Sequence, residues 1–342
     1  MELRPLGRTG VQVSALCLGA FGGWGNEDRS ATPHVIDRAL DSGINFVDTS
    51  DAYGIGESEE IIGRSLAAGK RDRVVLATKF SRPAGPDPNE GGLSRRWILQ
   101  AVDRSLRRLR TDWIDLYQIH SLDTAVDIDE TLGALSDLVL AGKVRYIGTS
   151  TFPAHELVAA QWTARLRGRQ RFVCEQSPYS MIARGAERDV FPVCQEYGIA
   201  ALAWSPIGGG WLSGRYRRGS EPPRSARIAV LPKSYDPDLP ANQRKLDAAD
   251  ALAGVAEAAG LTLIQLAIAF VLEHPAISAA IVGPRTPEHL DAYLGALDVD
   301  LGIDLLDRID EIVAPGTNVN PSDPGWDPPA ISDASLRRRT RR

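Results

Sequence analysis

The sequence predicts a single (β/α)8 barrel, the TIM-barrel architecture, with an N-terminal hairpin, long loops and an extended C-terminal tail. Strand-like and helix-like runs alternate along most of the 342 residues, which is the order found in parallel α/β folds. The strand-like runs are hydrophobic throughout, as expected of parallel strands buried on both faces. Because an α/β barrel of this length forms one domain, we expect residues 1–314 to form the barrel and residues 315–342 an irregular or partly disordered tail.

The individual elements follow from local patterns. Residues 3–13 read as a hairpin with a turn marked by glycine. Eight strands are predicted at residues 15–18, 44–47, 74–78, 114–118, 144–148, 172–174, 199–203 and 279–282. Helices are predicted at residues 32–42, 57–68, 94–110, 129–141, 153–166, 189–197, 243–259, 262–273 and 287–295, with an added one at 304–313. The connection over residues 208–240 is far longer than an ordinary loop, which indicates a functional role.

An open, doubly wound sheet is the rival interpretation. It requires a glycine-rich turn that follows the first strand and leads directly into a helix. The stretch Gly22-Gly23-Trp24-Gly25 lacks the G-x-G-x-x-G spacing of such a turn, and no acidic residue follows at the required distance. The barrel is therefore favoured.

Composition narrows the function classes. The net charge of −5 gives no global basic field for nucleic acid or an anionic membrane, and no apolar run is long enough to span a bilayer. Cys17, Cys174 and Cys194 are too few and too scattered for a disulfide framework or a metal site. We expect a cytoplasmic protein that acts on a small molecule, with no metal, no nucleic-acid partner and no membrane partner. A homo-oligomer is possible, and the sequence leaves the oligomeric state open.

Four polar residues follow successive predicted strands. Asp48 and Tyr53 come after the second strand, Lys79 after the third and His120 after the fourth. In a parallel barrel these strand ends meet on one face. A free tyrosine phenol loses its proton only near pH 10, and a neighbouring ammonium favours the phenolate. Lys79 can act on Tyr53 in this way, Asp48 can compensate the buried ammonium, and a neutral His120 can orient a carbonyl. Together they suit proton delivery to a carbonyl oxygen.

Two longer stretches carry a resemblance to a known family. Residues 43–63, and residues 93–120 with the run Asp112-Trp113-Ile114-Asp115-Leu116-Tyr117-Gln118-Ile119-His120, resemble the signatures of the aldo-keto reductases. The similarity is nearest the long-chain branch that includes the β subunits of voltage-gated potassium channels and related bacterial reductases. The resemblance implies a barrel that binds NADP(H) without a Rossmann domain. It also implies that Asp48, Tyr53, Lys79 and His120 are catalytic, with Tyr53 as general acid in carbonyl reduction.

The same resemblance implies a set of cofactor contacts. Ser150 and Gln176 match the pair that holds the nicotinamide amide, and Trp204 matches the aromatic residue that stacks on the nicotinamide ring. The pyrophosphate contacts implied are Ser205, Ile207 and Gly208 through backbone N–H groups, and Arg215, with Arg224 or Arg227 as a further candidate. The adenosine end is implied at Gly283, Arg285 and His289.

The sequence departs from the family pattern at three of these positions. His289 stands where Gln or Arg is common, Tyr293 where Asn is common, and Thr151 replaces the Asn that commonly follows Ser150. These changes leave the choice between NADPH and NADH open. We expect the substrate pocket to be walled by Phe21, Trp24, Phe152 and Tyr179, with the 208–240 connection and Trp326 of the tail.

Three functions are compatible with these residues. The first is an NADPH-dependent aldo-keto reductase that converts an aldehyde or ketone to an alcohol. The second is a cofactor-sensing regulatory module like the channel β subunits, which keep the same four residues. The third is a sugar-nucleotide keto or enoyl reductase, which changes only the substrate.

Overall fold

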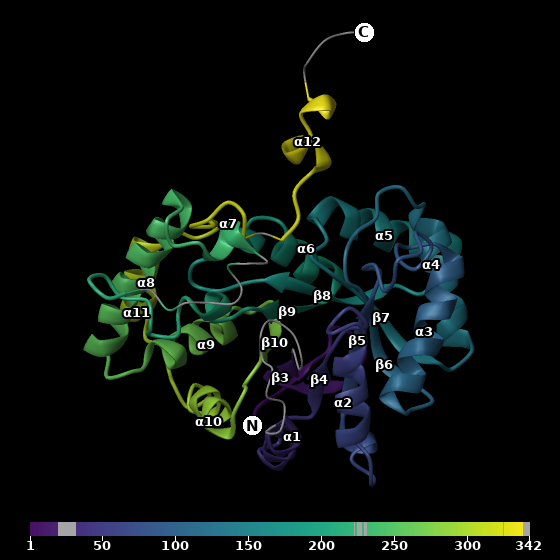
Figure 1. Ribbon diagram of the computed structural model, residues 1–342, viewed down its shortest axis with the longest axis horizontal. Helices are drawn as coiled ribbons and strands as arrows, with labels where there is room; N and C mark the ends of the chain where they lie inside the picture. Colours follow the sequence, from purple (N-terminus) through teal and green to yellow (C-terminus); the bar gives the residue numbers. More distant parts are fainter. Residues whose placement is uncertain (20–31, 222, 224–227, 229–230, 324, 338–342) are drawn as a thin grey trace.

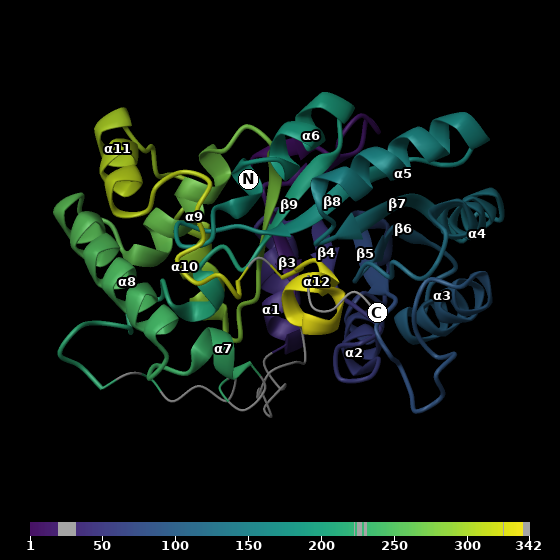
Figure 2. The ribbon, with the colours of Figure 1, turned by 90° about the horizontal axis from the view of Figure 1, so that it is seen from above.

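Eight parallel strands form a closed barrel surrounded by helices (Figures 1 and 2). The computed structural model describes residues 1–19, 32–221, 223, 228, 231–323 and 325–337. The strand order is β10-β3-β4-β5-β6-β7-β8-β9, so neighbours in the chain are neighbours in the barrel. Parallel pairing of β10 with both β3 and β9 closes the ring. The predicted (β/α)8 barrel is confirmed.

The elements have the following bounds. The hairpin strands are β1 (Leu3–Pro5) and β2 (Gln12–Ser14). The barrel strands are β3 (Leu16–Gly19), β4 (Phe46–Asp48), β5 (Val75–Phe80), β6 (Ile114–Ile119), β7 (Val144–Ser150), β8 (Phe172–Pro178), β9 (Ala200–Trp204) and β10 (Ile277–Val282). The helices are α1 (Thr32–Asp41), α2 (Glu57–Ser65), α3 (Arg95–Leu109), α4 (Ile128–Leu140), α5 (Ala154–Arg167), α6 (Val190–Tyr197), α7 (Pro232–Tyr235), α8 (Pro240–Ala258), α9 (Leu263–Glu273), α10 (Pro287–Leu294), α11 (Ile303–Ile312) and α12 (Pro329–Ser332).

Two elements differ from the prediction for clear reasons. Helix α2 ends at Ser65 rather than at residue 68, and Ala68 and Gly69 then adopt positive φ angles of 58° and 80°, which an α-helix does not contain. Strand β8 continues to Pro178 rather than ending at residue 174. The polar residues Glu175, Gln176 and Ser177 hide this extension in the sequence, although each pairs with a neighbouring strand.

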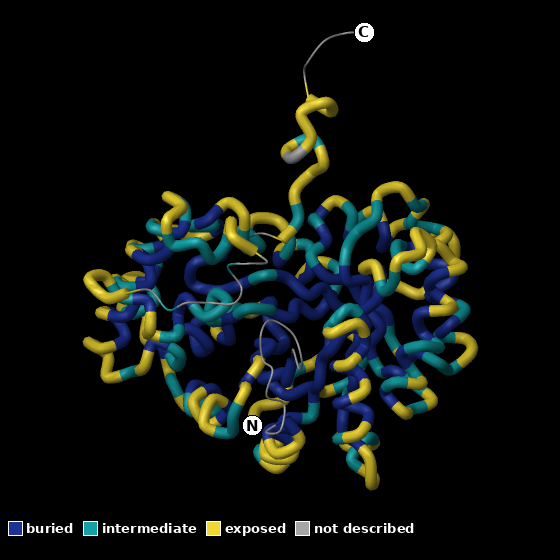
Figure 3. Tube along the Cα trace, viewed as in Figure 1, coloured by how far each residue is buried: buried dark blue, intermediate teal, exposed yellow. Residues whose placement is uncertain are grey.

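Side chains on each strand alternate between the barrel interior and the layer beneath the helices. The interior cluster includes Cys17, Phe46, Ala77, Leu116 and Leu202. Leu6 and Val13 of the N-terminal hairpin belong to the same cluster, so the hairpin closes the end of the barrel where the strands begin. Figure 3 shows the resulting buried centre inside a more exposed ring. The other end, where the strands finish, is left for the polar residues.

Buried polar groups also lie on the outward face of the strands. Thr78 of β5 donates a hydrogen bond of 2.6 Å to Glu59 of α2, and Arg108 of α3 pairs with the same carboxylate at 2.6 Å. Thr149 of β7 donates a hydrogen bond of 2.6 Å to the fully buried Glu175 of β8. These contacts connect strands and helices without reaching the barrel interior.

The first part of the C-terminal tail is fastened to the barrel. The Val319 N–H donates to the Ile182 carbonyl at 3.0 Å, and Asn320 donates to Asn242 of α8 at 2.7 Å. Lys245 of α8, which is 2% exposed, pairs with Asp323 at 2.8 Å. Farther along the chain, α12 projects from the barrel (Figure 1).

In the part of the chain that the structure describes, no single helix is both long and apolar enough to cross a membrane. The segments Pro232–Ala258 and Leu263–Glu273 pass that test only as a pair, with a bend of 94° between them.

We predict that Glu175→Gln removes a pH dependence of stability. Burial, opposed by hydrogen bonds from Thr149 and Ser177, raises the pKa of Glu175 from 4.5 to about 8. Between these values the folded chain binds more protons than the unfolded chain, so stability falls as pH rises, by about 1.4 kcal/mol per pH unit. Urea denaturation at several pH values should show that the free energy of unfolding of the variant rises relative to that of the wild type from about pH 5 to pH 8. If the difference in unfolding free energy between the variant and the wild type does not change with pH, the prediction is wrong.

Candidate active site

The alternation of the strands directs one set of polar side chains into the barrel. Asp48 is the last residue of β4, Lys79 lies within β5, and His120 follows β6 directly. Each stands an even number of residues from an interior side chain of its own strand, namely Phe46, Ala77 and Leu116, and therefore faces inward. Tyr53 lies in the turn that follows β4. The four residues predicted to converge are brought together at one end of the barrel.

Lys79 and Asp48 form a buried ion pair at this end. The Lys79 Nζ lies 2.5 Å from Asp48 Oδ2 and 2.9 Å from the Thr49 carbonyl oxygen. The Lys79 side chain is fully enclosed. Burial alone would lower the pKa of Lys79, but the charge of Asp48, and then Tyr53, outweigh it, so the pKa is raised. Lys79 is an ammonium at neutral pH.

The second oxygen of Asp48 is held by two amides. Gln118 donates to Asp48 Oδ1 at 2.9 Å, and Gln176 donates to the same atom at 3.2 Å. Gly148 makes room for this arrangement, because a Cβ there would lie 2.8 Å from the Cys174 sulfur. Sequence reasoning missed Gln118. Its position two residues before His120, on the inward face of β6, was the available signal.

Tyr53 lies over this ion pair. The Lys79 Nζ is 5.1 Å from the centre of the Tyr53 ring, and a side-chain hydrogen bond that Lys79 donates to Tyr53 is one of the influences that raise the pKa of Lys79. The ring of His120 meets that of Tyr53 edge to face, with centroids 5.6 Å apart. The phenol therefore stands between an ammonium and an imidazole.

His120 is a neutral imidazole at pH 7. Burial, and then the charges of Lys79 and Arg82, lower its pKa well below the usual 6.5. Its Nδ1 lies 2.9 Å from the Ser50 hydroxyl. Neutral histidine keeps a proton on only one ring nitrogen, so it acts as a single hydrogen-bond donor.

Three predicted nicotinamide contacts line one side of the same interior. Ser150 and Gln176 are paired neighbours on β7 and β8, and the Ser150 hydroxyl donates to the Gln176 carbonyl at 3.0 Å. Trp204 ends β9 and packs against the barrel interior cluster. All three lie on inward positions, and Gln176 contacts Asp48 directly.

His289 and Arg285 were predicted for the adenosine end of the cofactor, and Arg215 for its pyrophosphate. Burial, and then the charges of Arg285 and Arg215, lower the pKa of His289, so each arginine lies within electrostatic range of this histidine. Arg215 lies in the connection after β9, where its Nε donates to the Ser213 hydroxyl. Arg285 and Gly283 are exposed at the end of β10, and Arg285 makes no ion pair with a described residue.

Comparison with known proteins identifies the family of this chain. The sequence model of the Aldo/keto reductase family matches residues 15–314. The chain belongs to this family. It is 37% identical over 323 residues to an uncharacterized oxidoreductase, YrpG, of Bacillus subtilis, covering 91% of this chain and 96% of that protein.

Two further relatives align over nearly the whole of this chain. A putative voltage-gated potassium channel subunit beta of Schizosaccharomyces pombe is 34% identical over 323 residues, covering 92% of this chain and 93% of its own length. Versiconal hemiacetal acetate reductase of Aspergillus parasiticus is 34% identical over 343 residues, covering 92% and 98%. The predicted branch of the aldo/keto reductases is confirmed, and the family assignment makes this chain an oxidoreductase.

Several predicted contacts of this aldo/keto reductase need correction. The Gly208 N–H donates to the Ser205 carbonyl at 2.8 Å, so it is not free to bind a pyrophosphate. Tyr179 packs between Phe191 and Phe270 and donates its hydroxyl proton to Glu187, and it belongs to the core rather than to a pocket wall.

Phe152 also belongs to the core, since it is 2% exposed and packs against Phe172. From the sequence alone, an aromatic residue that follows a strand and faces a pocket cannot be distinguished from one that packs in the core. The predictions for Phe21, Trp24, Arg224 and Arg227 lie outside the described residues.

The C-terminal tail does reach the site. A Cβ on Gly325 would lie 2.8 Å from Thr151 and 3.3 Å from the Trp204 indole, and the ring of Trp326 lies 6.2 Å from that of His155. The segment around Gly325 therefore lies against Trp204 at the barrel mouth, while the predicted role of Trp326 in walling the substrate pocket stays a prediction.

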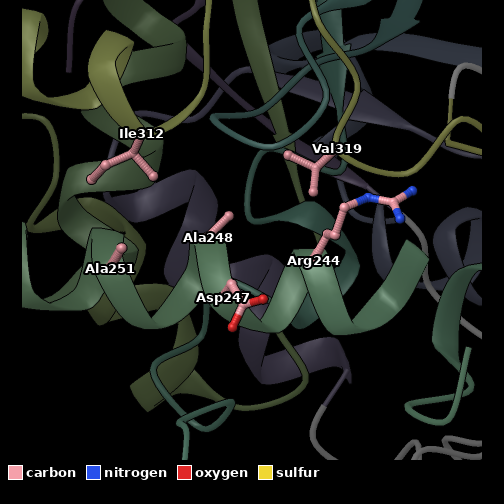
Figure 4. A pocket seen from close by; sticks show the side chains of 6 residues that line it. All are labelled: Arg244, Asp247, Ala248, Ala251, Ile312 and Val319. Atoms are coloured by element: carbon pink, nitrogen blue, oxygen red, sulfur yellow. The ribbon is translucent and has the colours of Figure 1, made fainter. Parts of the chain in front are cut away.

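A separate cavity of about 380 Å³ lies on α8, beside α11 and the fastened tail (Figure 4). It is lined by Arg244, Asp247, Ala248, Ala251, Ile312 and Val319. None of these residues belongs to the convergent cluster, so this cavity is not the active-site candidate.

We predict that Lys79→Met destabilises the protein by about 3–5 kcal/mol, because it leaves the Asp48 carboxylate buried without its cation. Adding Asp48→Asn removes that charge and keeps Oδ1 as an acceptor for Gln118 and Gln176. The double variant should therefore recover much of the loss. Chemical denaturation of the wild type, both single variants and the double variant completes a double-mutant cycle. A double variant no more stable than Lys79→Met would show that the two charges do not depend on each other.

Proposed function

We propose that this aldo/keto reductase reduces an aldehyde or ketone to an alcohol with NADPH, with Tyr53 as the proton donor. The observation that carries the proposal is the Lys79 ammonium, held at 2.5 Å by Asp48 directly beneath the Tyr53 ring. When a phenol gives up its proton, the adjacent ammonium stabilises the phenolate left behind. Asp48 fixes the ammonium in place through a contact that solvent does not screen.

His120 has a complementary role in this proposal. As a neutral imidazole it donates one hydrogen bond to the substrate oxygen and adds no positive charge beside Lys79. A donor aimed at an oxygen that becomes negative stabilises the transition state more than the ground state. Tyr53 then transfers its proton to that oxygen.

The residues present fit a nicotinamide dinucleotide. The Ser150 hydroxyl donates its proton to the Gln176 backbone carbonyl but can still accept, and the side-chain oxygen of Gln176 is a second acceptor. Both suit the amide nitrogen of a carboxamide, and Trp204 offers an aromatic face. When bound, the cofactor supplies the hydride for the carbonyl carbon. Arg285, with Arg215 and His289 nearby, supplies positive charge suited to the 2′-phosphate that distinguishes NADPH from NADH.

We predict that Tyr53→Phe lowers kcat for carbonyl reduction by about 10²–10⁴-fold, the range that general acid catalysis contributes. The Kd for NADPH should stay close to that of the wild type, because no predicted cofactor contact is changed. Loss of NADPH absorbance with nitrobenzaldehyde measures turnover, and fluorescence titration measures binding.

Tyr117→Phe is the matched control. Tyr117 stacks on Phe80 in the core beneath the helices, and its hydroxyl is buried without a hydrogen-bond partner among the described residues. Its removal should leave turnover intact. If Tyr53→Phe keeps wild-type turnover, the assignment of Tyr53 is wrong.

We predict that Arg285→Ala raises the Kd for NADPH by about tenfold or more and changes the Kd for NADH little. A hydrogen bond to a charged group contributes about 1.5–3 kcal/mol, and only NADPH carries the 2′-phosphate. Arg107→Ala, at an exposed position near the end of α3, is the control for loss of an arginine. Equal weakening of both cofactors would place Arg285 elsewhere on the dinucleotide.

A regulatory module is the second candidate function, favoured by the 34% identity to the Schizosaccharomyces pombe protein named as a putative potassium channel subunit. A panel of aldehydes and ketones separates the two functions. Tight NADPH binding without turnover of any member of the panel favours the module, whereas turnover that depends on Tyr53 favours the reductase.

A further inference from the structure

Ser50 occupies an unusual position beside the catalytic cluster. It is fully buried in the turn after β4, and its hydroxyl contacts His120 Nδ1 at 2.9 Å. The Ala52 N–H donates to the same oxygen at 3.2 Å. Two acceptors lie farther away, the Lys79 carbonyl at 3.4 Å and Asp51 Oδ1 at 3.5 Å. None of these contacts was anticipated from the sequence.

The hydrogen bonds of Ser50 allow only a few arrangements. A serine hydroxyl has one proton to donate, and the Ala52 amide already occupies one of its acceptor positions. If Ser50 donates to His120 Nδ1, the histidine proton lies on Nε2. If Ser50 donates to Asp51 instead, His120 must donate from Nδ1, and Nε2 carries only a lone pair. The 2.9 Å contact to His120 is present in both arrangements. The second arrangement, however, leaves the Ser50 proton only the distant acceptors at 3.4 and 3.5 Å, so the first makes better use of the hydrogen bonds.

Only the first arrangement suits carbonyl reduction. With Nδ1 engaged by Ser50, Nε2 is the nitrogen left for a substrate, since it makes no hydrogen bond to any residue that the structure describes. A protonated Nε2 attracts a carbonyl oxygen, whereas a bare lone pair repels it. We propose that Ser50 is a positioning residue that keeps the single proton of His120 on Nε2, where it meets the substrate oxygen. The proposal rests on the proposed carbonyl reduction.

Asp51 is the group that competes for the Ser50 proton. Its side chain is 2% exposed, and its Oδ2 has no hydrogen-bond partner among the described residues. Glu59 faces it from α2, Arg108 from α3 and the buried Tyr117 hydroxyl from β6. Burial and then Glu59 raise the pKa of Asp51 to about 7, against the opposing effects of Arg108, the Ser50 hydroxyl and the Ala52 amide.

The charge of Asp51 makes the hydrogen bond between Ser50 and His120 depend on pH. Below about pH 7 Asp51 is neutral and a weak acceptor, so the Ser50 proton stays with His120. As the pH rises through that value, the carboxylate becomes a stronger acceptor and draws the proton of Ser50 away. Burial, and then the charges of Lys79 and Arg82, hold the pKa of His120 well below its usual value, so His120 itself stays neutral throughout. We therefore expect kcat for reduction to decline above about pH 7, and Asp51→Asn to remove this decline.

The test measures the tautomer directly. In ¹⁵N-histidine-labelled full-length protein, long-range ¹H–¹⁵N spectra report which ring nitrogen is protonated, and loss of one of the five histidine signals in His120→Gln assigns His120. The wild type near pH 6 should show the proton on Nε2. Ser50→Ala should lose this preference and lower kcat by about 3- to 10-fold, the factor expected for one neutral hydrogen bond.

Ser58→Ala is the matched control, because Ser58 is also a fully buried hydroxyl near this turn but bonds to Thr49 at 2.7 Å rather than to His120. It should leave the tautomer and kcat unchanged. A wild-type His120 protonated on Nδ1, or an Ser50→Ala variant with an unchanged tautomer, overturns the proposal whatever the activity. Because the tautomer is observed without turnover, failure of this inference and failure of the proposed reductase activity are distinguishable.

Discussion

A lysine ammonium enclosed in an apolar barrel is the constraint that the rest of the site satisfies. The interior beneath Lys79 consists of Phe46, Ala77, Leu116 and similar side chains, none of which can solvate a charge. Asp48 supplies the opposite charge, the Thr49 carbonyl accepts a second hydrogen bond, and Gln118 and Gln176 satisfy the remaining oxygen of Asp48. Together with Lys79 itself, these groups lie in or directly after the four strands β4, β5, β6 and β8, so the charge is compensated only when the ring of strands has formed.

The two-residue period of the strands divides the polar residues into two sets. Lys79 faces the interior while the adjacent Thr78 bonds to Glu59 of α2, and Gln176 faces the interior while the adjacent Glu175 bonds to Thr149. The outward set has no access to a substrate, although it fastens the helices and loops that carry Tyr53 and Phe152. Neighbouring residues of similar chemistry therefore have unrelated functions, and a shift of register by one residue would exchange them.

The sequence was sufficient for the barrel and for the convergence of Asp48, Lys79 and His120, because both depend on strand order and on the common direction of parallel strands. It was insufficient where a contact depends on a distance of a few tenths of an ångström. The bonds of Ser50 to His120 and of Gln118 to Asp48 are of this kind, and so is the Gly208 amide, which a tight turn already occupies. The pocket-wall predictions for Tyr179 and Phe152 were wrong for another reason, because aromatic residues suit a core and a pocket equally.

The attachment of the C-terminal tail has a consequence for divergence among relatives. The family match ends at residue 314, yet Asp323 is anchored to Lys245 and Gly325 lies against Trp204. The rim over the Trp204 side of the barrel is thus built from a part of the chain that the shared barrel does not dictate. Duplicated genes can replace this rim without disturbing the buried ion pair, so selectivity for new compounds can evolve at the end of the polypeptide while the reaction chemistry is preserved.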